Sequence, residues 1–140
     1  MIRYRKYLIF IGIPLILIML YGLTYIPHKI INMEPSKVSS IIIFNGDSGY
    51  ETEISDKEAI QHIINNLNGI TFQKDKWAFI YTGYSFKTTI FNNKGKPIRK
   101  LTINSSDTIR YKGFFYKTRG RQIDYEYIRN LIESLPKKVP

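Results

Sequence analysis

The chain of 140 residues contains no cysteine and a single tryptophan. The lack of cysteine excludes disulfide bonds, thiolate metal sites, a cysteine nucleophile and lipidation of a cysteine. Only two histidines, His28 and His62, can act as imidazole bases or ligands. Acidic residues are also scarce, because 11 Asp and Glu stand against 21 Lys and Arg and leave a formal net charge of +10 at pH 7. This balance favours an anionic partner.

Motifs for nucleophilic catalysis are incomplete. Residues 83–87 begin like the G-x-S-x-G turn around Ser85, but Lys87 stands where that turn requires its second glycine. His62 falls on a predicted helix and His28 precedes the domain, so neither is placed as a base for Ser85. We therefore predict no enzyme. A hydrolytic enzyme that uses Ser85 or a cluster of carboxylates is the remote alternative.

Patterns for metal and phosphate binding are incomplete as well. Five carboxylates lie close together in sequence without the ligand spacing of an EF-hand: Asp47, Glu51, Glu53, Asp56 and Glu58. Of these, Asp56 and Glu58 fit the N-terminus of a helix. Lys94-Gly95-Lys96 is not a P-loop, because Ile90 stands at the first glycine position and Pro97 replaces Ser or Thr. The sequence predicts no metal site and no cofactor.

The sequence does contain a long apolar run without a charged residue, at positions 8–26, preceded by Arg3, Arg5 and Lys6. As a helix it would cover roughly 28 Å, close to the thickness of a bilayer core. Its exit lacks a small-x-small cleavage site, which favours an uncleaved transmembrane anchor over a signal peptide. The flanking charges then predict a single-pass protein of the cell membrane, with its N-terminus in the cytoplasm and the rest outside.

This interpretation divides the chain into four parts. They are a basic cytoplasmic N-terminus (1–7), a transmembrane anchor (8–26), a juxtamembrane linker (27–36) and an extracytoplasmic domain (37–140).

Hydrophobic periodicity predicts an α+β domain. Residues 38–44 and 50–54 are typical of strands, and Ser55 with Glu58 forms a capping-box pattern before a helix that ends near Asn68. Residues 70–79 are ambiguous between a short strand and a turn.

Four further strands are expected between residues 84 and 117, with a tight hairpin at Lys112-Gly113, and a last helix follows Asp124. The expected fold is therefore a transmembrane helix, then elements in the order ββα-βββββ-α. They form an antiparallel β-meander with two helices packed on one face.

Basic residues are concentrated in the middle of the domain, where residues 67–121 hold twelve Lys and Arg against Asp75 and Asp107. Residues 112–117 begin like the RNP1 strand of an RNA-binding module, but Phe115 and Lys117 break the motif, so we do not expect nucleic acid. Turns of a meander gather at its ends, and we predict an anion-contacting rim of Lys94, Lys96, Arg99, Lys100, Lys112, Lys117, Arg119 and Arg121. Its partner would be anionic lipid, a cell-wall polymer or a protein. A plain solvated face is the alternative.

The residues at 83–86, 93–98, 109–111, 115–116 and 123–128 give the chain a pattern similar to that of small uncharacterised secreted or membrane-anchored proteins of low-GC Gram-positive bacteria. This resemblance implies an extracytoplasmic α+β domain and transfers no site. The predicted function is a membrane-anchored, non-enzymatic domain that binds a surface partner or an anionic polymer. The alternative is an accessory subunit of a membrane protein complex that uses its transmembrane helix.

Overall fold

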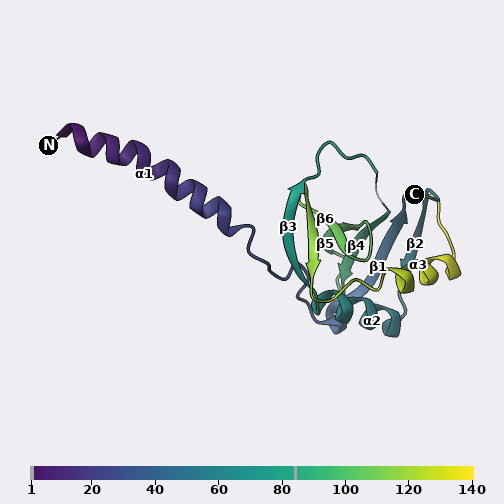
Figure 1. Ribbon diagram of the computed structural model, residues 1–140. Coiled ribbons are helices and arrows are strands. Elements are labelled where there is room, and N and C mark those ends of the chain that lie inside the picture. Colours follow the sequence, from purple (N-terminus) through teal and green to yellow (C-terminus); the bar gives the residue numbers. More distant parts are fainter. Residues whose placement is uncertain (1, 84) are drawn as a thin grey trace.

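A projecting helix and a small α+β domain make up the chain (Figure 1). The computed structural model describes residues 2–83 and 85–140, without the side chains of residues 2, 3, 5 and 6. The helix α1 (Ile2–Leu23) is followed by η1 (Pro35–Lys37), β1 (Val38–Asn45), β2 (Tyr50–Ile54), α2 (Lys57–Asn68), β3 (Thr71–Trp77), β4 (Phe86–Asn92), β5 (Pro97–Ile103), β6 (Thr108–Tyr111), β7 (Phe114–Arg119) and α3 (Tyr125–Ser134). The α+β class and the order ββα-βββββ-α after α1 agree with the sequence prediction.

The predicted transmembrane helix is wrong. Within the described part of the chain, no helix combines the length and the apolar character needed to cross a membrane. The helix stops at Leu23, and residues 24–26 form a turn, in which the Ile26 amide bonds to the Leu23 carbonyl. The helical apolar run from residue 8 to residue 23 would cover roughly 24 Å, less than the roughly 30 Å of a bilayer core.

The same finding overturns the predictions that depended on a membrane span. These are the single-pass cell-membrane location, the signal-anchor and the placement of the domain outside the membrane. The predicted basic N-terminus (1–7) lies partly outside the described residues, because Met1 and the side chains of Arg3, Arg5 and Lys6 are not described. The accessory-subunit alternative loses its basis together with the transmembrane helix.

The seven strands form one antiparallel sheet in the order β2-β1-β4-β5-β6-β7-β3. Only β4 to β7 form a meander of neighbours in sequence. Helix α2 carries the chain from the β2 edge to the opposite edge, where β3 pairs with β7 rather than with β4. The segment after β3 therefore has to cross the sheet before β4 begins (Figure 1).

The hydrophobic core lies between the sheet and the helices α2 and α3. The apolar stripe of α2 is buried as its spacing predicts, and Ile128 and Ile132 bury the matching face of α3. Asp56 caps the N-terminus of α2, because its carboxylate accepts a hydrogen bond from the Ala59 amide at 2.8 Å. The N-cap is thus Asp56, one residue after the predicted Ser55.

Both edge strands of the sheet are covered by segments near the chain ends. His28 forms an antiparallel bridge with Phe72 at the β3 edge, and Lys138 forms one with Glu51 at the β2 edge. Ile31 is fully buried, and the Met33 amide and carbonyl both bond to the Asn68 side chain at 3.1 and 2.7 Å. The predicted juxtamembrane linker (27–36) is therefore part of the folded domain.

Candidate functional site

The structure divides the predicted basic rim between the two ends of the β4–β7 meander. One end holds the β4–β5 and β6–β7 turns, and the other end holds the β5–β6 turn and the end of β7. The first end carries Lys94, Lys96 and Lys112, the second carries Lys117, Arg119 and Arg121, and Arg99 and Lys100 lie within β5. Anion binding by these residues stays a prediction.

Several cations of this set are engaged within the domain. The Arg99 guanidinium donates to the Tyr111 hydroxyl at 2.6 Å, and Arg119 Nε donates to the Gln73 side-chain oxygen at 2.6 Å. Lys117 forms an ion pair with Asp107 at 3.1 Å. These contacts hold neighbouring strands together, so these three side chains have structural partners already.

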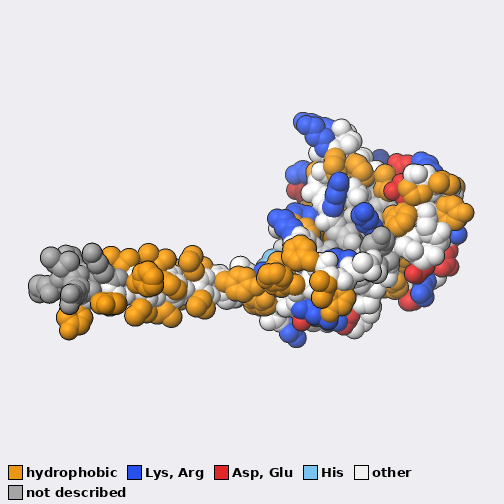
Figure 2. Space-filling view, turned by 90° about the horizontal axis from the view of Figure 1, so that it is seen from above, with side chains coloured by type: hydrophobic (Ala, Val, Ile, Leu, Met, Phe, Trp, Pro, Cys, Tyr) orange, Lys and Arg blue, Asp and Glu red, His pale blue; other side chains and the backbone are white. Residues whose placement is uncertain are grey.

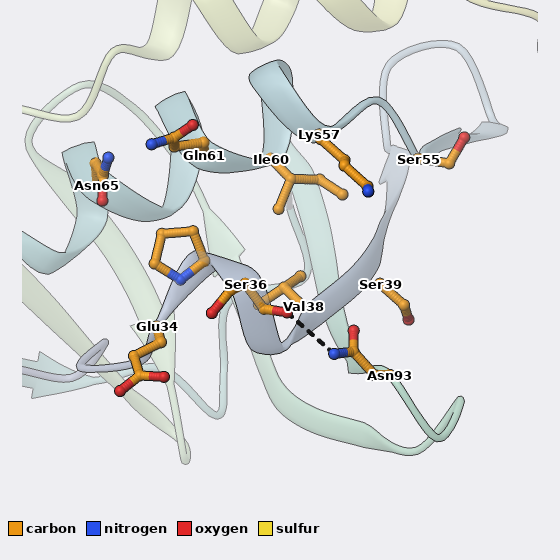
Figure 3. A pocket seen from close by; sticks show the side chains of 11 residues that line it. Glu34, Ser36, Val38, Ser39, Ser55, Lys57, Ile60, Gln61, Asn65 and Asn93 are labelled. Atoms are coloured by element: carbon orange, nitrogen blue, oxygen red, sulfur yellow. Dashed lines mark hydrogen bonds between the residues drawn. The ribbon is translucent and has the colours of Figure 1, made fainter.

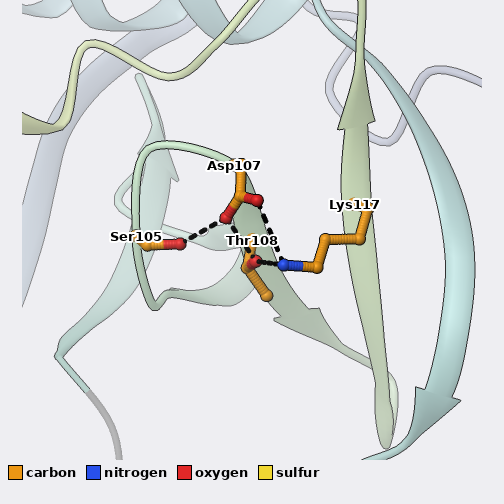
Figure 4. A network of polar contacts seen from close by, with 4 residues as sticks. All are labelled: Ser105, Asp107, Thr108 and Lys117. Carbon is orange, nitrogen blue, oxygen red and sulfur yellow. Dashed lines mark hydrogen bonds and ion pairs between the residues drawn. The ribbon is translucent and has the colours of Figure 1, made fainter.

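The Asp107 carboxylate is the centre of a polar network in the β5–β6 turn (Figure 4). It accepts hydrogen bonds from Thr108 at 2.6 Å, from Ser105 at 2.7 Å and from Lys117 at 3.1 Å. These hydrogen bonds lower the pKa of Asp107 from 3.8 to about 2, and the bond from Thr108 has the largest effect. The network stabilises the turn through the ionised carboxylate.

We expect Asp107→Asn to lower the free energy of unfolding by about 1 kcal/mol near neutral pH, a value reduced because the pair is 45% exposed. The folded-state pKa is depressed, so this stabilisation is complete above pH 4 and is lost as the pH falls towards 2. Urea unfolding of both proteins across this range measures the difference. A difference that stays constant down to pH 2 would contradict the assignment.

The candidate catalytic residues do not assemble. The Ser85 hydroxyl donates to the Asn104 carbonyl at 3.1 Å, whereas His62 pairs with Asp124 at 2.9 Å and packs on the Tyr127 ring at 4.0 Å. No Ser–His pair is found among the described residues. In that same set, no group of three or more histidine and acidic side chains is arranged to hold a metal ion.

The predicted carboxylate cluster is likewise used in structural contacts. Asp56 caps α2, and Glu53 forms an ion pair with Lys138 at 2.9 Å. The hydrogen bonds that pair Glu51 with Lys138 come from its backbone. These contacts explain part of the cluster without a ligand.

A cleft of about 760 Å³ lies between η1, β1, α2 and the β4–β5 turn (Figure 3). Its lining is mostly uncharged and polar, and the Asn93 amide donates to the Ser36 carbonyl across one side at 3.0 Å. Glu34 and Lys57 are its only charged side chains. Without a histidine or a paired carboxylate, this cleft offers no base for catalysis.

A more distinctive feature is a run of exposed apolar side chains at the end of β3. Trp77 is 61% exposed, Phe79 71%, Ile80 87% and Tyr81 43%. Large apolar side chains gathered on a surface mark interaction sites. Lys76 lies over the Tyr81 ring, Lys74 lies over Phe114, whose ring contacts Trp77, and Lys112 precedes Gly113, on which Phe79 packs. We call this set the aromatic–basic surface: Lys74, Lys76, Trp77, Phe79, Ile80, Tyr81 and Lys112.

Two of its lysines lie over aromatic rings. The Lys74 ammonium is 3.8 Å from the ring centre of Phe114, and 5.1 and 5.2 Å from those of Tyr21 and Tyr25 near the end of α1. The Lys76 ammonium is 4.9 Å from the ring centre of Tyr81. Rings at these distances attract a cation, so both ammonium groups are held in place.

A β-bulge explains how two lysines two residues apart reach different rings. In a regular strand, Lys74 and Lys76 would point to the same face of the sheet. The pairing of β3 with β7 is irregular between Lys74 and Trp77, and this shift changes the directions of the side chains. Trp77 thereby joins Lys74 beside Phe114, at 5.9 Å between ring centres, while Lys76 lies near Tyr81.

The backbone under the exposed side chains is fixed. The Arg110 guanidinium donates to the carbonyls of Tyr81 at 2.9 Å and Gly83 at 2.5 Å, and the Ala78 amide donates to the Gly113 carbonyl at 2.9 Å. The Tyr81 ring packs on buried Phe115 at 5.1 Å. The aromatic–basic surface is therefore presented by a backbone that the β6–β7 hairpin supports.

The aromatic–basic surface is continuous with the end of α1. Lys74 of β3 donates a hydrogen bond to the Thr24 hydroxyl at 3.2 Å, which connects β3 to the residues that follow α1. The hydrogen bond between the Tyr21 and Tyr25 hydroxyl groups is the largest cause of a lowered pKa of the Tyr21 phenol. The apolar side chains of α1 from Leu8 onward are exposed. Figure 2 shows them along the visible face of the helix, and hydrophobic side chains continue at its junction with the domain. This side of the molecule combines apolar and basic groups.

The sequence pattern did not predict this surface, because residues 70–79 are ambiguous between a short strand and a turn. Periodicity could not reveal it, since the apolar residues 77–81 follow one another without a helical or strand repeat. The available indication was the only tryptophan of the chain, placed directly after Lys74 and Lys76.

No protein family model, no curated protein and no solved structure matches this chain. The resemblance to small proteins of Gram-positive bacteria accordingly stays a prediction.

Proposed function

We propose that the chain is a non-enzymatic module that binds an anionic partner through its aromatic–basic surface. The observation that carries this proposal is the pair Lys74 and Lys76, held over aromatic rings beside four exposed apolar or aromatic side chains between residues 77 and 81. The lysines supply attraction, and the exposed rings supply apolar contact area.

The charges around the surface support an anionic ligand. Lys74, Lys76 and Lys112 stand against one neighbouring acid, Asp75, and the whole chain carries a net charge of +10. The described residues contain no Ser–His pair and no metal-binding group, which favours binding over catalysis.

The test compares two variants that remove the same charge from different places. In the first, Lys74, Lys76 and Lys112 are replaced by Gln; in the second, Lys94, Lys96 and Lys100 of the predicted rim are replaced by Gln. With inorganic polyphosphate as the probe, we expect the first variant to bind at least about tenfold more weakly than the parent, since each exposed cation contributes up to about 1 kcal/mol. Titration at two salt concentrations measures it.

The second variant is expected to lose less than about threefold, because β6 and β7 lie between the strands that carry its lysines and β3, which leads into the exposed rings. Equal losses in both variants would show attraction by net charge alone and would contradict a localised site. A larger loss in the second variant would move the site to the predicted rim.

A further inference from the structure

We propose that the aromatic–basic surface docks on the headgroup layer of an anionic lipid bilayer. The inference rests on the proposed function and names its partner. Contact with the surface of a bilayer differs from a membrane span, and it needs only side chains that reach the headgroup layer. In this arrangement, Trp77, Phe79 and Ile80 enter the interface, and Lys74 and Lys76 face anionic headgroups.

The exposure of the apolar side chains supports an extended partner surface into which side chains can insert. Ile80 is the most exposed of the set, at 87%, and Phe79 follows at 71%. Neither lines the cleft of Figure 3. Protruding apolar side chains of this kind fit a surface into which they can insert, as an interfacial bilayer region permits.

The composition of the surface also fits a lipid interface. Trp and Tyr side chains prefer the headgroup level, where the ring is apolar and its polar atom stays hydrated. Trp77 and Tyr81 provide two such rings, and Tyr21 and Tyr25 of the adjoining helix end provide two more. Lysine stems can lie along apolar surface while their ammonium groups reach phosphate. Lys74 and Lys76 both have this arrangement over rings.

The positive charges of the lysines favour anionic lipid over lipid without net charge. A cation close to an anionic membrane surface strengthens binding about fivefold. Lys74 and Lys76 together therefore predict a difference of roughly thirtyfold between the parent and a variant that lacks both. Asp75, exposed between them on β3, reduces this advantage without reversing its sign.

Trp77 makes the proposal testable in the full chain, since it is the only tryptophan. Because exposed α1 can itself bring the protein to lipid, the readout is the local emission of Trp77 and not co-sedimentation. With vesicles of equimolar phosphatidylcholine and phosphatidylglycerol, we expect a blue shift, and quenching by brominated acyl chains. Vesicles of phosphatidylcholine alone should give the same change only at roughly thirtyfold higher lipid concentration.

Two matched pairs of variants locate the contact. Replacing Lys74 and Lys76 by Gln should raise the lipid concentration for half-maximal blue shift about thirtyfold, whereas the same change at Lys57 and Lys137 should leave it within about threefold. Replacing Ile80 by Ser should reduce the quenching, whereas Ile98→Ser on β5, which is 38% exposed, should not.

Three results would overturn the inference. They are an emission of Trp77 that neither vesicle changes, an equal response to both vesicles, and an equal effect of the two lysine pairs. If polyphosphate binding still depends on Lys74, Lys76 and Lys112 but vesicles do not change the emission of Trp77, the lipid inference fails and the proposed function stands. The partner would then be a soluble anionic polymer or protein.

Discussion

Phe86→Ala is expected to lower the free energy of unfolding by about 3–5 kcal/mol. The Phe86 side chain is 1% exposed in the core, and its ring stacks on Tyr125 of α3, with ring centres 4.8 Å apart and planes 21° apart. Alanine would leave a cavity between β4 and α3 and remove this stacking. Equilibrium urea unfolding followed by circular dichroism measures the loss.

The matched control is Phe79→Ala, since Phe79 is 71% exposed. We expect it to cost less than about 1 kcal/mol, because little apolar area returns to water. Hydrogen exchange adds a local readout: Phe86→Ala should accelerate exchange in α3 more than in β3. Similar costs for the two variants would contradict the placement of Phe86 in the core.

Gly113→Val is expected to lower the free energy of unfolding by about 2–4 kcal/mol. Lys112 and Gly113 have φ angles of 47° and 81°, as a type I′ hairpin turn requires, and a β-branched residue strongly disfavours positive φ. A Cβ at position 113 would also lie 2.5 Å from Cζ of Phe79, so the ring must move. The variant therefore tests the hairpin and the aromatic–basic surface together.

Gly95→Val separates the cost of a positive φ angle from the cost of the contact with Phe79. Gly95 has a φ angle of 70° in the β4–β5 turn, but a Cβ there would meet nothing within 4 Å. We expect it to cost about 1–2 kcal/mol from the backbone alone. Adding Phe79→Ala should recover part of the loss of Gly113→Val and none of that of Gly95→Val. Equal losses for the two glycines would show that Phe79 does not pack on the hairpin.

The elements that the sequence predicted well have strong local patterns. In α2, the residues Ala59, Ile60, Ile63, Ile64 and Leu67 recur at helical spacing, and all five are buried. The Lys112-Gly113 hairpin was predictable because its backbone conformation depends on the glycine. The pairing of β3 with β7 could not be predicted in the same way, since it joins residues 37 to 48 positions apart in the sequence.

Two predictions near the N-terminus, the membrane span and its linker, were wrong. The predicted span ended at Ile26, but the helix ends at Leu23. Residues 27–36 were assigned to a linker, yet Ile30 and Ile31 are buried in the domain core and His28 pairs with Phe72. An apolar residue has the same hydropathy in a membrane, in a linker or in a core, so only its tertiary contacts distinguish them.

The sequence by itself determined the absence of cysteine chemistry, the basic charge of the chain and the order of helices and strands, because composition and local periodicity carry these properties. Tertiary structure decided which cations stand together. It separated Lys94 from Lys117 at opposite ends of the meander, and through a β-bulge it placed Lys74 and Trp77 beside Phe114. The physical reason is that sheet pairing and strand irregularities, and not distance along the chain, set the direction of each side chain.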